Sequence, residues 1–316
     1  MKRRTITLIV LVAAFALIAA ACSSDDSAEG FRMAIVAPSA ENDRAFTQSM
    51  VDAANSIEGA EVAVTDGTFN VDDAAVAIRD YADSGYDLVI AHGSQYGGSL
   101  AEIAPDFPEV SFAWGTAADT FGLPNVFSYE AASDQGGTVM GKMAAALSQS
   151  ANVGIVGPVE VGDAKLYVDG FEAGVLSQNP DATVKINYID SFSDVALASE
   201  AANSLIGAGA DVLSGTAQMT IGAINSAKTA GVLWFGTQSN QTDVAPEIVV
   251  ASQVYHWENM LNEMISKIKD GTLGGELYEI NFANDGLVIE YNEDFELPDD
   301  VQDIAEDAIQ TVKDQG

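Results

Sequence analysis

The stretch Asp83-Ser84-Gly85-Tyr86-Asp87 leads into the short apolar run Leu88–Ala91, and Gly207-Ala208-Gly209-Ala210-Asp211 leads into a second such run at Val212–Ser214. Each stretch places glycine where a helical pattern stops, which is the usual position of a residue that ends a helix. A strand follows directly in both places. The repeated junction indicates two related halves, each built from alternating helices and strands.

Short β-branched runs alternate with amphipathic stretches along the rest of the chain. The expected strands are Arg32–Ala37, Glu61–Thr65, Leu88–Ala91, Val110–Trp114, Val126–Tyr129, Asn152–Val156, Thr183–Tyr188, Val212–Ser214, Leu233–Gly236 and Ile248–Ser252. The expected helices are Arg44–Ile57, Val71–Ser84, Gly98–Asp106, Gln135–Ser148, Leu166–Ser177, Val195–Ala208, Thr220–Ala230 and His256–Lys269. Most of the strands are continuously apolar, as in parallel sheets that helices cover on both faces. The pattern predicts two doubly wound α/β domains, which 316 residues accommodate.

The composition excludes several classes of protein. An apolar fraction of 48% excludes a mainly disordered chain. With 13 basic and 47 acidic residues, the formal charge of −34 argues against nucleic acid as a partner and against a basic patch that binds anionic lipid. Salt adaptation or solubility explains that charge as well as any acidic functional patch does. The single cysteine excludes a disulfide framework, and one cysteine with two histidines argues against a metal centre. We expect no cofactor.

The first thirty residues resemble a targeting segment. Lys2, Arg3 and Arg4 precede an apolar run from Leu8 to Ala21, which is shorter than a membrane span but suits a signal peptide. Small residues stand directly before Cys22, as in a bacterial lipobox. We therefore expect a lipoprotein signal peptide over residues 1–21, a lipidated Cys22 and a flexible tether over residues 22–30. An ordinary secretory signal with a coincidental cysteine is the alternative.

The familiar signatures of enzymes do not occur in the sequence. It contains neither the complete phosphate loop Gly-x-x-x-x-Gly-Lys-Ser/Thr, since Met143 follows the run Gly136–Lys142, nor the Gly-x-Ser-x-Gly nucleophile elbow. The glycine-rich loop Gly93–Gly98 follows a strand, and ligands bind at that edge of open α/β sheets. Carboxylates are too frequent in this chain for a pair of them to indicate acid–base catalysis. A binding protein is therefore favoured over an enzyme.

Two phenylalanines lie at the expected ligand edge. Asn42 and Asp43 follow the first strand, Phe46 lies in the first turn of the expected first helix, and Phe192 is flanked by polar residues after a later strand. Asp43 is suited either to cap the helix or to contact a ligand, and Phe46 either to fill the core or to stack. Two rings on opposite lobes could sandwich a flat heterocycle, with Asp43 and Asn42 at its polar edge.

The order and spacing of several motifs then carry a resemblance to a known family. They are Asn42-Asp43-Arg44-Ala45-Phe46, Asn125-Val126-Phe127-Ser128-Tyr129, Asp134-Gln135-Gly136-Gly137, Asp169-Gly170-Phe171-Glu172-Ala173-Gly174, Ser191-Phe192-Ser193-Asp194, Gly209-Ala210-Asp211-Val212-Leu213 and Ala251-Ser252-Gln253-Val254-Tyr255-His256-Trp257. Over nearly all of residues 31–316 the chain resembles the basic membrane protein family of ABC-transporter substrate-binding lipoproteins, which includes bacterial purine-nucleoside receptors.

The resemblance implies a type I periplasmic-binding-protein fold. In that fold two doubly wound parallel-sheet lobes are joined by three crossovers, and the ligand cleft lies between them. Carried over to this chain, one lobe comprises residues 31–128 with 239–278, and the other comprises residues 129–238 with 279–316.

The resemblance also implies roles for particular residues. In the nucleoside-binding branch an aspartate holds the base and two phenylalanines sandwich it, at the positions of Asp43, Phe46 and Phe192. Gln238 and Tyr255 replace an aspartate and a lysine that serve ribose there, while the segments around Tyr255 and Leu297 look more like a branch that binds free nucleobases. The candidate ligand-binding residues are Asn42, Asp43, Phe46, Tyr96, Trp114, Phe192, Gln218, Gln238, Tyr255 and Trp257. Tyr96, Trp114 and Trp257 are equally suited to the core.

The expected function is capture of a purine base, a nucleoside or a similar small heterocycle outside the cytoplasm, followed by delivery to an ABC permease. Lobe closure around the ligand accompanies capture. We expect a monomer that the lipid on Cys22 anchors to the cell membrane. Two alternatives remain: the same cleft could bind a sugar or a signalling molecule, or the protein could be a membrane-tethered sensor or regulator. An enzyme ranks third.

Overall fold

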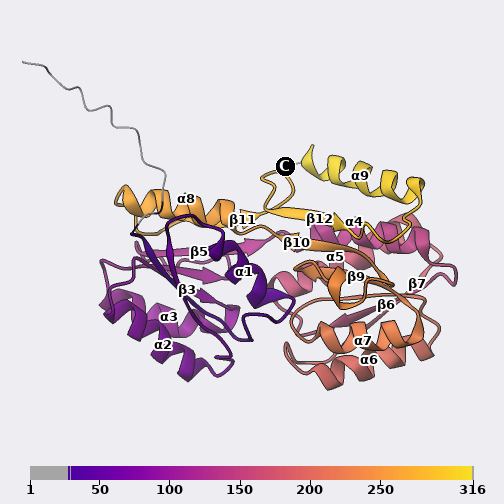
Figure 1. Ribbon diagram of the computed structural model, residues 1–316, viewed down its shortest axis with the longest axis horizontal. Coiled ribbons are helices and arrows are strands. Elements are labelled where there is room, and N and C mark those ends of the chain that lie inside the picture. Colours follow the sequence, from indigo (N-terminus) through magenta and orange to yellow (C-terminus); the bar gives the residue numbers. More distant parts are fainter. Residues whose placement is uncertain (1–27, 29, 315–316) are drawn as a thin grey trace, which may run out of the picture.

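The computed structural model describes residue 28 and residues 30–314, which build two six-stranded sheets lying side by side (Figure 1). The first sheet has the strand order β11 (Leu277–Ile280), β5 (Val126–Ala131), β4 (Ser111–Gly115), β3 (Leu88–His92), β1 (Arg32–Val36) and β2 (Glu61–Thr65). The second has the order β12 (Leu287–Tyr291), β10 (Val249–Tyr255), β9 (Leu233–Gln238), β8 (Val212–Gly215), β6 (Asn152–Gly157) and β7 (Thr183–Tyr188). Neighbouring strands run parallel, apart from the antiparallel pair β10 and β12. The predicted pair of doubly wound lobes is confirmed.

Helices cover both faces of each sheet (Figure 1). Those of the first lobe are α1 (Phe46–Asn55), α2 (Val71–Asp83), α3 (Gly97–Ile103) and α8 (Glu258–Lys269). Those of the second are α4 (Ser133–Leu147), α5 (Gly162–Gln178), α6 (Val195–Gly207), α7 (Thr220–Ala230) and α9 (Asp299–Lys313). The central strands are buried along their whole length, as in β3 and β8, because helices exclude water from both of their faces.

The predicted grouping of segments into lobes needs a correction. That grouping put residues 239–278 with the first lobe, whereas β10 pairs with β9 and β12 in the second sheet. The chain enters the first lobe again only after Tyr255, where it forms α8 and then β11 against β5. The strand that follows β9 therefore extends its own sheet before the chain crosses over.

Three elements near the carboxyl terminus were not predicted. The strand β11 has only four residues and lies at a sheet edge with Leu277 exposed, so that its sequence carries little hydrophobic pattern. The edge strand β12 is mostly half-buried. The helix α9 has a single buried stripe of Val301, Ala305 and Ala308 among many carboxylates, and it packs on α4.

Glycines bring α4 and α5 into direct backbone contact. A methyl group on Gly141 would overlap the carbonyl oxygen of Phe171, and one on Gly174 would overlap the carbonyl oxygen of Thr138. Gly137 and Gly170 lie equally close to the facing backbone. We call these four glycines the glycine seam. Because packing this close leaves no space for one helix to shift against the other, the two helices form one rigid unit.

The expected signal peptide over residues 1–21 and the lipidated Cys22 lie outside the described residues, as does most of the expected tether. Among the helices that the structure describes, none has the length and apolar character that a membrane span requires.

Candidate ligand-binding site

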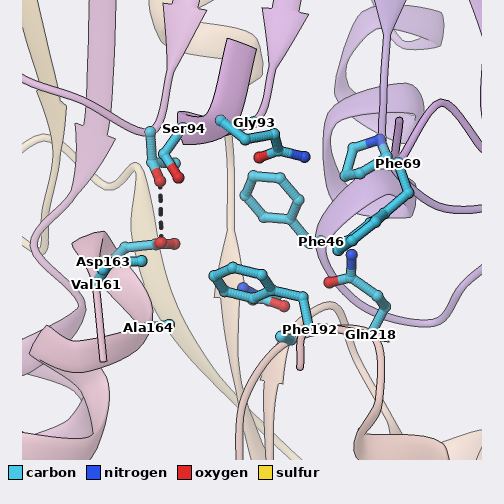
Figure 2. Close-up of a pocket in the computed structure, with 14 residues that line it drawn as sticks. Phe46, Phe69, Gly93, Ser94, Val161, Asp163, Ala164, Phe192 and Gln218 are labelled. Carbon is cyan, nitrogen blue, oxygen red and sulfur yellow. Dashed lines mark hydrogen bonds between the residues drawn. The ribbon is translucent and has the colours of Figure 1, made fainter. Parts of the chain in front are cut away.

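A cavity lies between the two lobes, at the ends of several parallel strands, and its empty space is about 410 Å³ when the open solvent at its mouth is included (Figure 2). Gly93 and Thr116 follow β3 and β4 of the first sheet, and Ala217 follows β8 of the second. Ligands of open α/β sheets bind at this carboxyl edge. The lining residues are Pro38, Phe46, Phe69, Gly93, Ser94, Gln95, Thr116, Val161, Asp163, Ala164, Phe192, Ala217, Gln218 and Gln238.

Three phenylalanine rings line the cavity, those of Phe46, Phe69 and Phe192, and Phe46 and Phe192 come from opposite lobes. Phe46 begins α1 in the first lobe, and Phe192 lies in the loop between β7 and α6 in the second. Figure 2 shows the two rings on facing sides of the same space. Flat π-faces of this kind are suited to stack on a planar heterocycle.

His92 supports the ring of Phe46 from behind. The imidazole stacks on that ring at a centroid distance of 3.8 Å and is fully buried. Its Nε2 lies 3.1 Å from the carbonyl oxygen of Phe46, and its Nδ1 lies 2.8 Å from the hydroxyl of Tyr129. Since a carbonyl only accepts, Nε2 carries the proton and Nδ1 accepts from Tyr129. Burial lowers the pKa of His92 to about 3, so the ring is neutral at physiological pH.

Asp163 is the acidic residue of the cavity lining. It lies in the first turn of α5 and is 6% exposed. Thr116 of the first lobe donates to its Oδ1 at 3.0 Å, which Figure 2 marks as a dashed line, and Tyr255 donates to its Oδ2 at 3.2 Å. Burial raises the pKa of Asp163, while these hydrogen bonds act in the opposite direction.

Two glutamines add polar groups to the lining. Gln218 follows β8 and Gln238 ends β9, where its backbone takes a left-handed conformation with φ of 70°. The side-chain oxygen of Gln238 is buried and has no hydrogen-bond partner among the described residues. An amide without a partner in a cavity wall is available to a ligand.

Hydrogen bonds join the two lobes beside the cavity. The hydroxyl of Ser239 donates to the carbonyl oxygen of Ala45 at 2.8 Å, and the side-chain amide of Gln241 donates to that of Arg44 at 3.2 Å. The Thr116–Asp163 bond spans the lobes as well. The lobes are thus in contact on more than one side of the cavity, as expected of a closed arrangement.

Four of the ten predicted ligand-binding residues line the cavity, namely Phe46, Phe192, Gln218 and Gln238. Asn42 is exposed in the loop before α1. Asp43 serves as a helix cap: its carboxylate accepts from the backbone N–H groups of Ala45, Thr47 and Gln48 and from the hydroxyl of Ser39. Asp43 thus satisfies N–H groups at the start of α1, and it is not among the residues that line the cavity.

The remaining four predicted residues support the walls from outside. Tyr96 is fully buried and donates to the carbonyl oxygen of Thr68. Trp114 stacks on Phe121. Trp257 is buried beside His92 and donates to Ser49, and Tyr255 bonds to Asp163 rather than facing the cavity. Ring size and polarity alone did not separate these supporting roles from contact with a ligand.

Residues 31–315 match the family described as PnrA-like ABC transporter substrate-binding proteins (Bmp). The chain belongs to this PnrA-like family. It is 27% identical over 241 residues to a purine-binding protein of Brucella abortus, a match that covers 76% of this chain and 67% of the relative. It is 25% identical over 321 residues to the nucleoside-binding protein BmpA of Lactococcus lactis, with 91% of each chain covered. A solute-binding protein structure from Conexibacter woesei superposes with a TM-score of 0.75 at 25% identity, over 90% of this chain and 97% of that one.

As a PnrA-like protein, the chain has the two-lobed fold of ABC solute-binding proteins, and the type I architecture expected from the sequence is confirmed. Sequence reasoning missed several residues of the cavity. Ser94 and Gln95 lie in the glycine-rich loop that was singled out as a ligand position, without being named. Asp163 follows β6 at the same sheet edge, so the rule that pointed to the loop after β3 would have found it too. Among the described residues, no group of three or more His, Cys, Asp or Glu side chains is arranged to hold a metal ion.

Proposed function

We propose that this PnrA-like protein captures a purine base or nucleoside between Phe46 and Phe192 and releases it, chemically unchanged, to an ABC permease. The observation that carries the proposal is the placement of these two rings on opposite lobes of one cavity. A ligand held by both rings stabilises the closed arrangement, because each ring belongs to a different lobe. The names of the purine-binding and nucleoside-binding relatives support the same ligand class.

Within this class we favour a free base over a nucleoside. The resemblance places the charged groups that serve ribose at the positions of Gln238 and Tyr255. Gln238 lines the cavity but is uncharged, and uncharged partners form weaker hydrogen bonds to hydroxyls. The hydroxyl of Tyr255 bonds to Asp163 and Ser133, so that it serves the wall and not the ligand. Neither position therefore supplies the charge that ribose would require.

We further propose that the protein works outside the cytoplasm as a monomer, tethered through lipid on Cys22. The small residues that precede Cys22 support this proposal. The expected result is that metabolic labelling with a radioactive fatty acid marks the wild-type protein and not Cys22→Ser. Equal labelling of the two proteins would exclude the anchor.

Thermal denaturation of residues 31–316 with candidate ligands tests the binding proposal. The panel contains purine and pyrimidine bases, their nucleosides and a set of sugars. A ligand at a hundred times its dissociation constant stabilises a native protein by about 2.7 kcal/mol, which gives a clear rise in the melting temperature. We expect purine bases to give the largest shift. Equal shifts with nucleosides would show that ribose is accepted, and a shift with sugars alone would exclude the purine proposal.

A further inference from the structure

The cavity lining has an acid but no base. Of the fourteen residues that line it in the described part of the chain, Asp163 is a carboxylate and none is lysine or arginine. At 6% exposure, Asp163 receives little solvation from water. A buried carboxylate without a cation is costly unless hydrogen-bond donors surround it.

The hydrogen-bond donors that the protein supplies do not offset the burial of Asp163. An ionised carboxylate has about four lone-pair sites. In the part of the chain that the structure describes, its side-chain donors are the hydroxyls of Thr116 at Oδ1 and Tyr255 at Oδ2, and the backbone N–H groups of Asp163 and Ala164 also favour the charged form. These hydrogen bonds favour the charged form of the carboxyl group, but burial outweighs them and raises the pKa of Asp163. The carboxyl group that lines the cavity is therefore one that a further donor, supplied by a ligand, would stabilise.

A second acceptor stands without a partner in the same wall. The buried side-chain oxygen of Gln238 has no donor among the described residues. The three phenyl rings of the lining offer faces for stacking but no hydrogen-bond donors. Asp163 and Gln238 therefore both present acceptors to the cavity. A ligand that carries only acceptors could not form hydrogen bonds with them.

We propose that Asp163 is the specificity-determining residue of this site and that it selects planar heterocycles that present an N–H donor toward the second lobe. The inference rests on the proposed function and extends it by naming the group that reads the polar edge of the base. A base with a ring N–H or an exocyclic amino group satisfies the carboxylate, and an N-alkylated base leaves it unpaired. The charged hydrogen bond accounts for about a 10- to 100-fold difference in affinity.

Isothermal titration of residues 31–316 with matched bases tests the inference. The ligands are guanine, adenine and hypoxanthine, together with forms methylated in turn at each ring nitrogen or on the amino group. We expect one methylated position to lower affinity about 10- to 100-fold in the wild-type protein. We expect Asp163→Asn to lower affinity for the parent base to a similar extent, while affinity for that methylated base changes less than about twofold, because the lost contact is the same.

Two control variants separate recognition from structure. Asp169→Asn removes a carboxylate from the same helix, where it bonds to Lys165 on the surface, and should change no affinity. Thr116→Val removes the bond between the lobes but keeps the carboxylate. It should weaken all bases by a similar factor and preserve the ratio between parent and methylated forms. A loss of that ratio in Thr116→Val would overturn the assignment to Asp163.

The outcomes distinguish this inference from the proposed function. If the wild-type protein binds none of these bases, the proposed function fails and the inference with it. If it binds purines but Asp163→Asn binds them equally well, only the inference fails. If Asp163→Asn does not fold, the titrations of the wild-type protein with the parent and methylated bases still test the inference. Equal affinity for all of these bases would overturn the role of the carboxylate.

Discussion

The phenyl ring of Phe46 lies flat against the imidazole of His92, with centroids 3.8 Å apart and planes inclined by 11°. The imidazole is tied to the carbonyl oxygen of the same Phe46 through Nε2 and to Tyr129 through Nδ1. The neutral, buried imidazole of His92 thus packs against one face of the Phe46 ring, and Phe46 also lines the cavity. A ring fixed in this way loses little conformational entropy when a ligand stacks on it.

Alanine at either cavity ring should weaken binding. Phe46→Ala and Phe192→Ala each remove one stacking face, and we expect a loss of about 1–3 kcal/mol in binding free energy from each. Isothermal titration with the best purine ligand measures this loss. Phe121→Ala is the matched control, because Phe121 stacks on Trp114 and does not line the cavity. Unchanged affinity in both cavity variants would exclude the sandwich.

His92 should make stability fall in mild acid. The unfolded chain binds a proton at this residue below about pH 6.5, whereas the folded protein does so only near pH 3. The free energy of unfolding therefore decreases as pH falls through this window. Between pH 7 and pH 5 the contribution is about 2 kcal/mol.

Urea denaturation of wild-type protein and His92→Gln at both pH values measures this contribution. Glutamine keeps a polar side chain at this position without the titration. We expect the variant to be less stable at pH 7 but to lose less stability on going to pH 5. A parallel decline in the two proteins would show that another group titrates. Asp163, whose raised pKa acts with the opposite sign, is present in both proteins and cancels.

Asp43→Ala should lower stability more than it lowers affinity. Its carboxylate accepts three backbone N–H groups at the start of α1 and one hydroxyl, so we expect a cost of about 2 kcal/mol in unfolding free energy. Asp194→Ala is the comparison, because that carboxylate caps α6 through the single N–H of Leu197 and should cost about 1 kcal/mol. Chemical denaturation gives both values. A large loss of affinity with stability preserved would instead indicate a direct contact between Asp43 and the ligand.

Ser239→Ala should loosen the closed arrangement without touching the ligand. It removes the bond to the carbonyl oxygen of Ala45 across the lobes, worth about 0.5–1.5 kcal/mol. We expect affinity to fall about 2- to 10-fold for every ligand alike, since fewer molecules are closed before binding. Small-angle scattering of the ligand-free variant should show a larger radius of gyration. Ser199→Ala, which removes a bond between α6 and α7 within one lobe, should leave both measurements unchanged.

The sequence predicted the two α/β lobes, ten of the twelve strands in the part of the chain that the structure describes, and the cavity rings of Phe46 and Phe192 but not that of Phe69, because these follow from short-range patterns. Apolar runs identify strands that are buried on both faces, and polar neighbours marked Phe192 as a loop residue. The sequence did not predict that the carboxylate of Asp43 would bond to backbone N–H groups at the start of α1, or that Asp163 would line the cavity. Both depend on which side of a loop turns toward the other lobe, and that is set by contacts between residues far apart in the chain, such as Thr116 with Asp163.

The glycine seam between α4 and α5 has a consequence for how this protein can diverge from its relatives. Because the two helix backbones touch, Ser133 at one helix start and Asp163 at the other are carried on a single frame. Natural variants can exchange side chains in the loops and so acquire new cargo while the frame stays intact. An alanine in the seam would displace both ends together. Among relatives of this protein, we therefore expect Gly137, Gly141, Gly170 and Gly174 to be substituted less often than the residues that determine ligand specificity.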